Sequence, residues 1–343
     1  MKKQYNGLDM LKFTMALLIA ARHLIQLFYP PDSLLQFIIS RWLSNLGVPI
    51  FFTAAGFFLF SRIDGSLNTR TTDKKTILAY CKRILILYLI WSALYLPYNW
   101  SNRFSYGQSP KEMLGTYLHW TVFSSTVVQL WYLPALAAAC FFVWFLYSRG
   151  MKIWQLLLLT GLLFGIGCVC DNWFFNQHLP EILKHLLRLY YKYFLTARNG
   201  VFYGSFFICL GLWFAKSKKQ FSPLSAFLPA LFFIGLMSAE VKYCFNTNMI
   251  FSSVPAVFFL FAAAVSVSWK DNSIYKRLRE MSEWIYLSHT YFFFLFSLAA
   301  FCHLPVPGGS FGAFIMMGTI LLFAWGMTRL SEYQKCKWLK KMI

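Results

Sequence analysis

The chain has 343 residues, of which 58% are hydrophobic, 20% aromatic and only 13% charged, and its mean hydropathy is +0.53. Soluble domains carry about 25% charged residues, so this composition excludes a soluble enzyme and predicts an integral membrane protein in contact with the lipid bilayer. The net charge of +20 does not indicate a nucleic-acid partner, because the basic residues lie between long apolar runs instead of on one polar face.

Ten apolar segments follow one another between charge clusters or turn residues. Each approaches the length of about 20 residues that a helix needs to cross a hydrocarbon core about 30 Å thick. Their approximate bounds are 10–28, 40–61, 84–100, 127–148, 153–170, 199–215, 223–240, 249–268, 283–302 and 311–330. The sequence therefore predicts an all-α fold, a single polytopic transmembrane domain over 1–343 of about ten helices, with no soluble domain.

The lysines and arginines orient this bundle, because they accumulate on the cytoplasmic side of membrane proteins. When the connecting segments are assigned to alternate sides, 22 basic residues fall on the side of the N-terminus and seven on the other. We therefore expect both termini in the cytoplasm. Two outer loops are long enough to carry structure, 101–126 and 171–198. In the second, apolar residues recur at helical spacing between basic ones, which predicts an amphipathic helix on the membrane surface.

Ionisable residues inside the spans are the functional candidates, because a charge in the bilayer is costly. In the first span, Asp9 and Lys12 lie near the cytoplasmic end, and Arg22 and His23 lie further along. The 14 residues from Asp9 to His23 correspond to about 21 Å of helix, which excludes a catalytic dyad. His23 is either a general base in a bundle cavity or a packing histidine bonded to a neighbouring carbonyl, and the sequence leaves both readings open.

The ninth span contains a second histidine, His289, one helical turn after Tyr286. It is a second candidate base or substrate ligand, whereas we expect Glu283 to be an interfacial charge. Metal-ligand spacings and cofactor-binding motifs do not occur in the sequence, so no metal site and no bound cofactor are predicted. Two GxxxG pairs, 161/165 and 200/204, are expected to allow close helix packing.

Four short motifs are spread over nearly the whole chain. The first runs from an aspartate to a histidine, the second from an arginine through a proline to paired phenylalanines, the third is Trp-Tyr-Leu and the fourth Tyr-Leu-x-His. Their main residues are Asp9, His23, Arg41, Pro49, Phe51, Phe52, Trp131, Tyr132, Tyr286 and His289. In this order the four segments together resemble the acyltransferase 3 family of bacterial membrane proteins.

The resemblance implies a multi-pass O-acyltransferase of the bacterial plasma membrane. Such a protein moves an acyl group, here expected to be acetyl, from cytoplasmic acyl-CoA to a hydroxyl group of a cell-envelope glycan. His23 would act as the catalytic base, and Arg41 would hold donor phosphates or steady an oxyanion. Acyl-CoA is then a donor substrate, bound near Arg83, Lys82 and Lys12. The expected substrate-binding residues are Asp9, Arg22, Trp131, Tyr132, Tyr286 and His289.

Two positions depart from the family pattern. The family commonly carries Arg-x-x-Arg at the start of the third helix, where this chain has Tyr80 at the first position and Arg83 at the second. Lys82 is a possible substitute, and Lys12 stands where arginine is usual. Because lysine is a point charge without the bidentate fork of arginine, recognition of phosphate or carboxylate would be geometrically weaker.

An alternative function comes from one branch that shares this bundle, the membrane half of serine racemases associated with vancomycin resistance. The segments KRILILYLIWSALYLP and ARNGVFYGSFFICLG resemble that branch. The racemase half, which needs a pyridoxal-phosphate lysine, does not occur in these 343 residues, so we do not expect racemisation. The alternative is a non-catalytic transporter of a small amino acid such as L-serine, with Arg22, Arg41 and His289 binding a carboxylate near mid-membrane.

Overall fold

The structure is a computed structural model that describes residues 4–65, 69–104, 107, 109–171, 177–194, 196–217, 219–244 and 249–343. Regular secondary structure in these ranges is helical throughout, which confirms the predicted all-α class. Eight helical stretches of the described chain are long and apolar enough to cross a membrane, and two shorter apolar helices, Gly200–Lys216 and Ser253–Ser266, accompany them. Each of the ten predicted spans overlaps one of these stretches. The cytoplasmic location of the termini stays a prediction.

The predicted bounds were wrong by more than one turn in the third and ninth spans. In the ninth, helix α13 (Ser273–Phe301) begins ten residues before the predicted start. Helix α3 (Arg70–Leu94) begins 14 residues before the predicted start, because its polar first half continues the helix without a break. Lys82 and Arg83 consequently lie in the middle of α3.

The two long loops predicted on the outer side are partly helical. The first contains α4 (Leu96–Phe104) and α5 (Pro110–Phe123), and α5 begins with a reciprocal cap between Ser109 and Glu112. The second contains α9 (Glu181–Tyr191), which confirms the predicted helix, while its position on the membrane surface stays a prediction.

The described chain forms two compact units, each discontinuous in sequence. Unit 1 comprises Met1–Gly47, Phe221–Pro229 and Phe259–Ile343, and unit 2 comprises Val48–Gln220 and Ala230–Phe258. Helices α11 (Pro223–Cys244) and α12 (Ser253–Ser266) are divided between the two units, and so is α2 (Gly47–Phe60), of which only Gly47 belongs to unit 1. Whether the chain acts as one domain stays a prediction.

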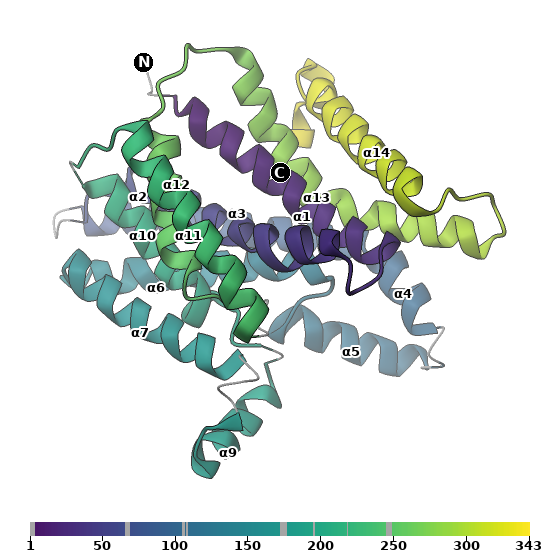
Figure 1. Ribbon diagram of the computed structural model, residues 1–343, viewed down its shortest axis with the longest axis horizontal. Coiled ribbons are helices and arrows are strands. Elements are labelled where there is room, and N and C mark those ends of the chain that lie inside the picture. Colours follow the sequence, from purple (N-terminus) through teal and green to yellow (C-terminus); the bar gives the residue numbers. More distant parts are fainter. Residues whose placement is uncertain are drawn as a thin grey trace. The chain divides into compact units, whose positions relative to one another are not determined.

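Unit 1 is built around α1 (Asn6–Phe28), which packs along α13 (Ser273–Phe301) and also contacts α14 (Gly309–Leu330) (Figure 1). Contacts between α1 and α13 follow the same order along both helices, so the two helices are parallel. The π-helix η1 (Gln36–Trp42) and the 3-10 helix η2 (Leu43–Leu46) pack against α1, and the 3-10 helix η5 (Gln334–Lys341) follows α14.

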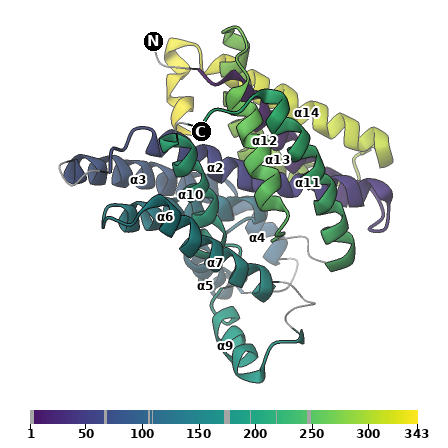
Figure 2. The ribbon, with the colours of Figure 1, turned by 60° about the vertical axis from the view of Figure 1, so that its left-hand side comes forward.

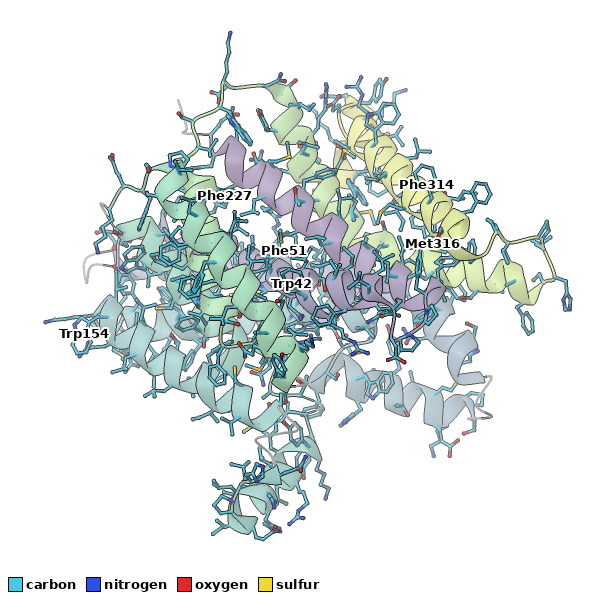
Figure 3. All side chains as sticks on the ribbon, viewed as in Figure 1. Trp42, Phe51, Trp154, Phe227, Phe314 and Met316 are labelled. Atoms are coloured by element: carbon cyan, nitrogen blue, oxygen red, sulfur yellow. The ribbon has the colours of Figure 1, made fainter. Side chains whose placement is uncertain are left out.

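Helix α14 shows how the sequence separates an inner from an outer face. Its buried residues recur at every fourth position: Gly312, Met316, Ile320, Ala324 and Thr328. This spacing places them on one side of the helix. Phe314 is 78% exposed, whereas Met316 is 3% exposed (Figure 3). An exposed apolar face of this kind fits contact with lipid.

Unit 2 contains α2 (Gly47–Phe60), α3, η3 (Val128–Trp131), α6 (Tyr132–Tyr147), α7 (Ile153–Asp171), η4 (Gly200–Gly204) and α10 (Ser205–Lys216). Helix α6 packs on α3 and α10, and α7 packs on α10 (Figure 2). Close backbone approach in this unit depends on glycine. A Cβ atom on Gly211 would overlap the carbonyl oxygen of Thr53, so α10 and α2 are in backbone contact there.

The two GxxxG pairs differ in their packing. A Cβ atom on Gly200 would lie 2.5 Å from the Ala135 carbonyl oxygen, which confirms close packing against α6. At Gly161 and Gly165 a Cβ atom would meet only ring atoms, at 3.4 and 4.0 Å. Those are ordinary contact distances, so the prediction of close packing was wrong for this pair.

Candidate functional site

The two histidines singled out from the spans lie against each other in unit 1. The imidazole rings of His23 on α1 and His289 on α13 are stacked, with ring centroids 5.4 Å apart and an interplanar angle of 24°. His289 has no exposed surface, and His23 is half-buried. Parallel packing of α1 and α13 thus brings together two candidates that are 266 residues apart in sequence.

Helix geometry determines which nitrogen of His289 carries a hydrogen. Its Nδ1 lies 2.9 Å from the carbonyl oxygen of Ile285, one turn earlier in α13. A carbonyl oxygen only accepts hydrogen bonds, so Nδ1 is the donor, and in the neutral ring the Nε2 atom carries the free lone pair. The unprotonated nitrogen is therefore the one that points away from the backbone of its own helix.

The Nε2 atom of His289 is buried and has no hydrogen-bond partner in the part of the chain that the structure describes. Most buried polar atoms in proteins are hydrogen-bonded, and leaving one unpaired costs about 1–3 kcal/mol. Aromatic rings surround the histidine pair: Phe293 is 5.7 Å from the His289 centroid and 6.2 Å from that of His23, and Tyr286 is 6.4 Å from that of His289. The site combines an apolar wall with one unsatisfied acceptor.

Polar residues around η1 hold the segment of α1 that carries His23. Arg22 Nη1 donates to Asn45 Oδ1 at 3.1 Å, and Ser40 Oγ donates to the Arg22 carbonyl at 3.0 Å. Arg41 is exposed, and its Nη2 donates to the Pro31 carbonyl at 3.3 Å. Ser40 and Asn45 were not among the predicted site residues. Their polar side chains at the start of an apolar span could have indicated a role in the site. The roles of Arg22 and Arg41 in binding or catalysis stay predictions.

Two ion pairs join α1 to α13 one turn apart. Asp9 pairs with Arg279 at 3.3 Å, and Lys12 pairs with Glu283 at 3.4 Å. Glu283 was predicted to be an interfacial charge, whereas the structure gives it a partner on α1. The predicted roles of Asp9 in substrate binding and of Lys12 in donor binding remain predictions, but both charges are already compensated within unit 1.

In unit 2 the predicted residues Trp131 and Tyr132 belong to one aromatic cluster. The Phe52 ring contacts both, with centroid distances of 6.3 and 4.7 Å, and Tyr203 lies 6.0 Å from Trp131. The guanidinium carbon of Arg198 lies 4.6 Å from the Trp131 centroid, a cation–π contact that the sequence did not predict. Aromatic faces beside a fixed cation suit a polar ring-shaped or anionic ligand.

The predicted donor-binding residues lie on the outer face of α3 in unit 2. Lys82 and Arg83 are both exposed, and Tyr80 is half-buried. Cys81, between them, is buried and its Sγ atom donates to the Ala137 carbonyl of α6 at 3.4 Å. The two basic residues thus point away from the packed side of α3. Among the described residues no three metal-ligating side chains converge.

Comparison with known proteins supports the resemblance. A family model described as an acyltransferase domain matches residues 5–329. A protein of Enterococcus faecalis named "Amino-acid racemase" is 28% identical over 219 residues, which are 64% of this chain and 29% of that protein. A second with the same name and organism is 24% identical, over 84% of this chain and 41% of that protein.

A third relative extends the same pattern. A protein of Enterococcus gallinarum named "Serine/alanine racemase" is 25% identical over 299 residues, which are 83% of this chain and 40% of that protein. The chain thus spans well under half the length of these relatives. No solved structure matches.

Proposed function

This chain belongs to the acyltransferase 3 family, and we propose that it transfers an acyl group from cytoplasmic acyl-CoA to a hydroxyl group of a cell-envelope glycan. The observation that carries the proposal is the stacked pair of His23 and His289 in unit 1, because it places a basic ring and an unsatisfied acceptor in one largely apolar environment. We also propose that the protein lies in the bacterial plasma membrane. Its long apolar helices support this location.

His23 is assigned as the general base. It is half-buried, and imidazole is the side chain best suited to take a proton near neutral pH. The glycan oxygen attacks the thioester carbonyl carbon of the donor while His23 takes the hydroxyl proton. Collapse of the tetrahedral intermediate breaks the carbon–sulfur bond, and the imidazolium returns the proton to the departing CoA thiolate.

Cationic side chains are assigned to bind the negative charges of the donor phosphates and of the oxyanion in the transition state. Lys82 and Arg83 form an exposed basic pair on α3 that suits the phosphates of acyl-CoA. Arg41 is exposed beside the polar network of η1, where a guanidinium can stabilise an oxyanion. Trp131 and Tyr132 supply aromatic surface for a sugar ring.

Transport of a small amino acid such as L-serine is the second candidate function. Two relatives named as amino-acid racemases favour this function. Their matches cover 84% and 83% of this chain. In this reading Arg22, Arg41 and His289 bind the carboxylate. The guanidinium of Arg22 is already engaged by Asn45, and the unprotonated Nε2 of His289 cannot donate a hydrogen bond to a carboxylate. Arg41 is therefore the residue that fits this reading best.

Purified protein in proteoliposomes with acetyl-labelled acetyl-CoA and a glycan acceptor tests the proposal. We expect His23→Ala to lower acyl transfer by about 10²–10⁴-fold, the usual contribution of general acid–base catalysis. His185→Ala is the matched control, because His185 is exposed on α9, and it should leave transfer unchanged. Saturable serine uptake that survives His23→Ala, together with no acyl transfer by the unmodified protein, would establish transport instead.

A further inference from the structure

The 3-10 helix η5 of unit 1 carries a dense positive charge. Four of its eight residues are lysines. It begins at Gln334, shortly after α14 ends at Leu330, and α14 is long and apolar enough to cross a membrane. A helix that follows a membrane-spanning helix this closely lies near the lipid headgroups.

The geometry of η5 sorts its side chains into rows, because residues three apart lie above one another in a 3-10 helix. One row faces the protein: Leu339 is 6% exposed, and Cys336 is half-buried. A second row consists of Lys335, Trp338 and Lys341, all of them exposed. At a rise of about 2 Å per residue this row is about 12 Å long, with an indole ring between two cations.

The acidic side chains at this end of unit 1 are already paired. Glu280 of α13 pairs with Lys340 at 3.5 Å, and Glu332 pairs with Arg277 and Arg329, each at 3.0 Å. No ion pair within the described residues involves the other three lysines of η5. Their positive charge is therefore available to a partner outside the chain.

We infer that η5 binds the anionic phospholipids of the membrane that α14 crosses. Lysines attract anionic headgroups, each contributing about fivefold to binding, and their alkyl stems reach along apolar surface. Tryptophan and tyrosine favour the boundary between headgroups and acyl chains. Trp338 is 58% exposed and Tyr333 67% exposed, so both rings are available to this boundary. This inference goes beyond acyl transfer and does not depend on it.

Hydrogen exchange of the backbone amides of residues 333–343, measured by mass spectrometry on the full chain in nanodiscs, tests the inference. The nanodiscs contain phosphatidylcholine alone or phosphatidylcholine mixed with phosphatidylglycerol. Leu339 is the buried residue of η5, so the helix opens easily, and a ligand that binds the closed helix slows exchange. We expect phosphatidylglycerol to slow exchange about tenfold or more, and high salt to reverse this effect.

Three sets of substitutions separate charge from local structure. The change of Lys335, Lys337 and Lys341 to glutamine should make exchange equal, within about twofold, in the two kinds of nanodisc. The same three positions changed to arginine should keep the slowing, because the charge remains. The matched control removes three charges from exposed positions of unit 2 and should also keep it: Lys74→Gln, Lys75→Gln and Lys152→Gln.

Trp338→Ala should speed exchange in both kinds of nanodisc, because the indole contact with the interface does not depend on lipid charge. The inference is overturned if phosphatidylglycerol slows exchange of the glutamine variant as much as that of the unmodified protein, or if it slows neither. It is also overturned if free coenzyme A slows exchange equally in phosphatidylcholine nanodiscs, since η5 would then bind soluble phosphates.

Discussion

The ammonium nitrogen of Lys12 lies 3.4 Å from a carboxylate oxygen of Glu283, one turn along α1 from the pair of Asp9 and Arg279. Lys12 is 13% exposed and Glu283 35% exposed, so neither charge is fully solvated. These pairs join α1 and α13, the two helices that also carry His23 and His289. The histidines meet nearer the C-terminal end of α1. Their role is to hold α1 and α13 in register.

Neutralising Glu283 should therefore destabilise unit 1. We expect Glu283→Gln to lower the free energy of unfolding by about 1–2 kcal/mol, less than the cost of breaking a fully buried pair because Glu283 is partly solvated. Urea unfolding in detergent micelles measures the change. The double reversal Lys12→Glu with Glu283→Lys should recover most of it. Glu332→Gln, which removes surface pairs with Arg277 and Arg329, serves as the control and should change stability by less than Glu283→Gln does.

Donor binding on α3 gives a second prediction. Arg83→Ala should raise the KM for acetyl-CoA about tenfold, because a charged hydrogen bond to phosphate is lost. Tyr80→Arg restores two arginines three residues apart on one helix face and should lower this KM several-fold. Lys75→Ala, an exposed lysine of the first half of α3, is the control. Equal KM values in all four proteins would place the donor elsewhere.

The backbone contact of α2 and α10 gives a third prediction. Gly211→Ala places a methyl group against the Thr53 carbonyl and should cost about 1–3 kcal/mol of stability, the usual penalty of overpacking. Gly235→Ala on α11 has open space around it and should be neutral or stabilising by up to about 1 kcal/mol. Denaturant unfolding compares the two. A neutral Gly211→Ala would mean that the two backbones do not touch.

The C-terminal end of α7 gives a prediction about alkaline pH. The Asp171 carboxylate accepts hydrogen bonds from the Tyr191 hydroxyl at 2.6 Å, from the Ala197 N–H at 2.8 Å and from the Thr196 hydroxyl. Burial, reinforced by the Asp171 charge, raises the pKa of Tyr190 to about 12. Burial and the hydrogen bond to Asp171 also raise the pKa of Tyr191.

An unfolded tyrosine ionises near pH 10, so the folded chain holds these protons more tightly than the unfolded chain. The contribution of Tyr190 to stability is complete below about pH 10 and declines as the pH rises toward 12. Tyrosinate absorbance during an alkaline titration follows both groups. Asp171→Asn should move their ionisation to lower pH, whereas Asp32→Asn, at an exposed position, should not. Identical titrations in the two variants would contradict the assignment.

Much of the fold followed from apolar length alone, because each membrane-spanning helix satisfies its own backbone hydrogen bonds. The length of an apolar stretch does not show how far the helix continues into the polar residues beside it. The start of α3 was therefore misplaced, and Lys82 and Arg83 were expected at a helix end when they lie in its middle. In the site, His23 and His289 were recognisable because ionisable residues are rare in spans. Arg198 was missed because a basic residue in an outer loop is usually solvated.

The sequence by itself determined the all-helical membrane class, the family and the two histidines, since these depend on composition, periodicity and local motifs. Only the tertiary structure decided that the histidines stack, that Glu283 neutralises Lys12 and that His289 keeps Nε2 unpaired. Contacts between residues some 270 positions apart depend on which faces of two helices meet. That choice comes from side-chain packing summed over whole helices, which no local pattern of residues specifies.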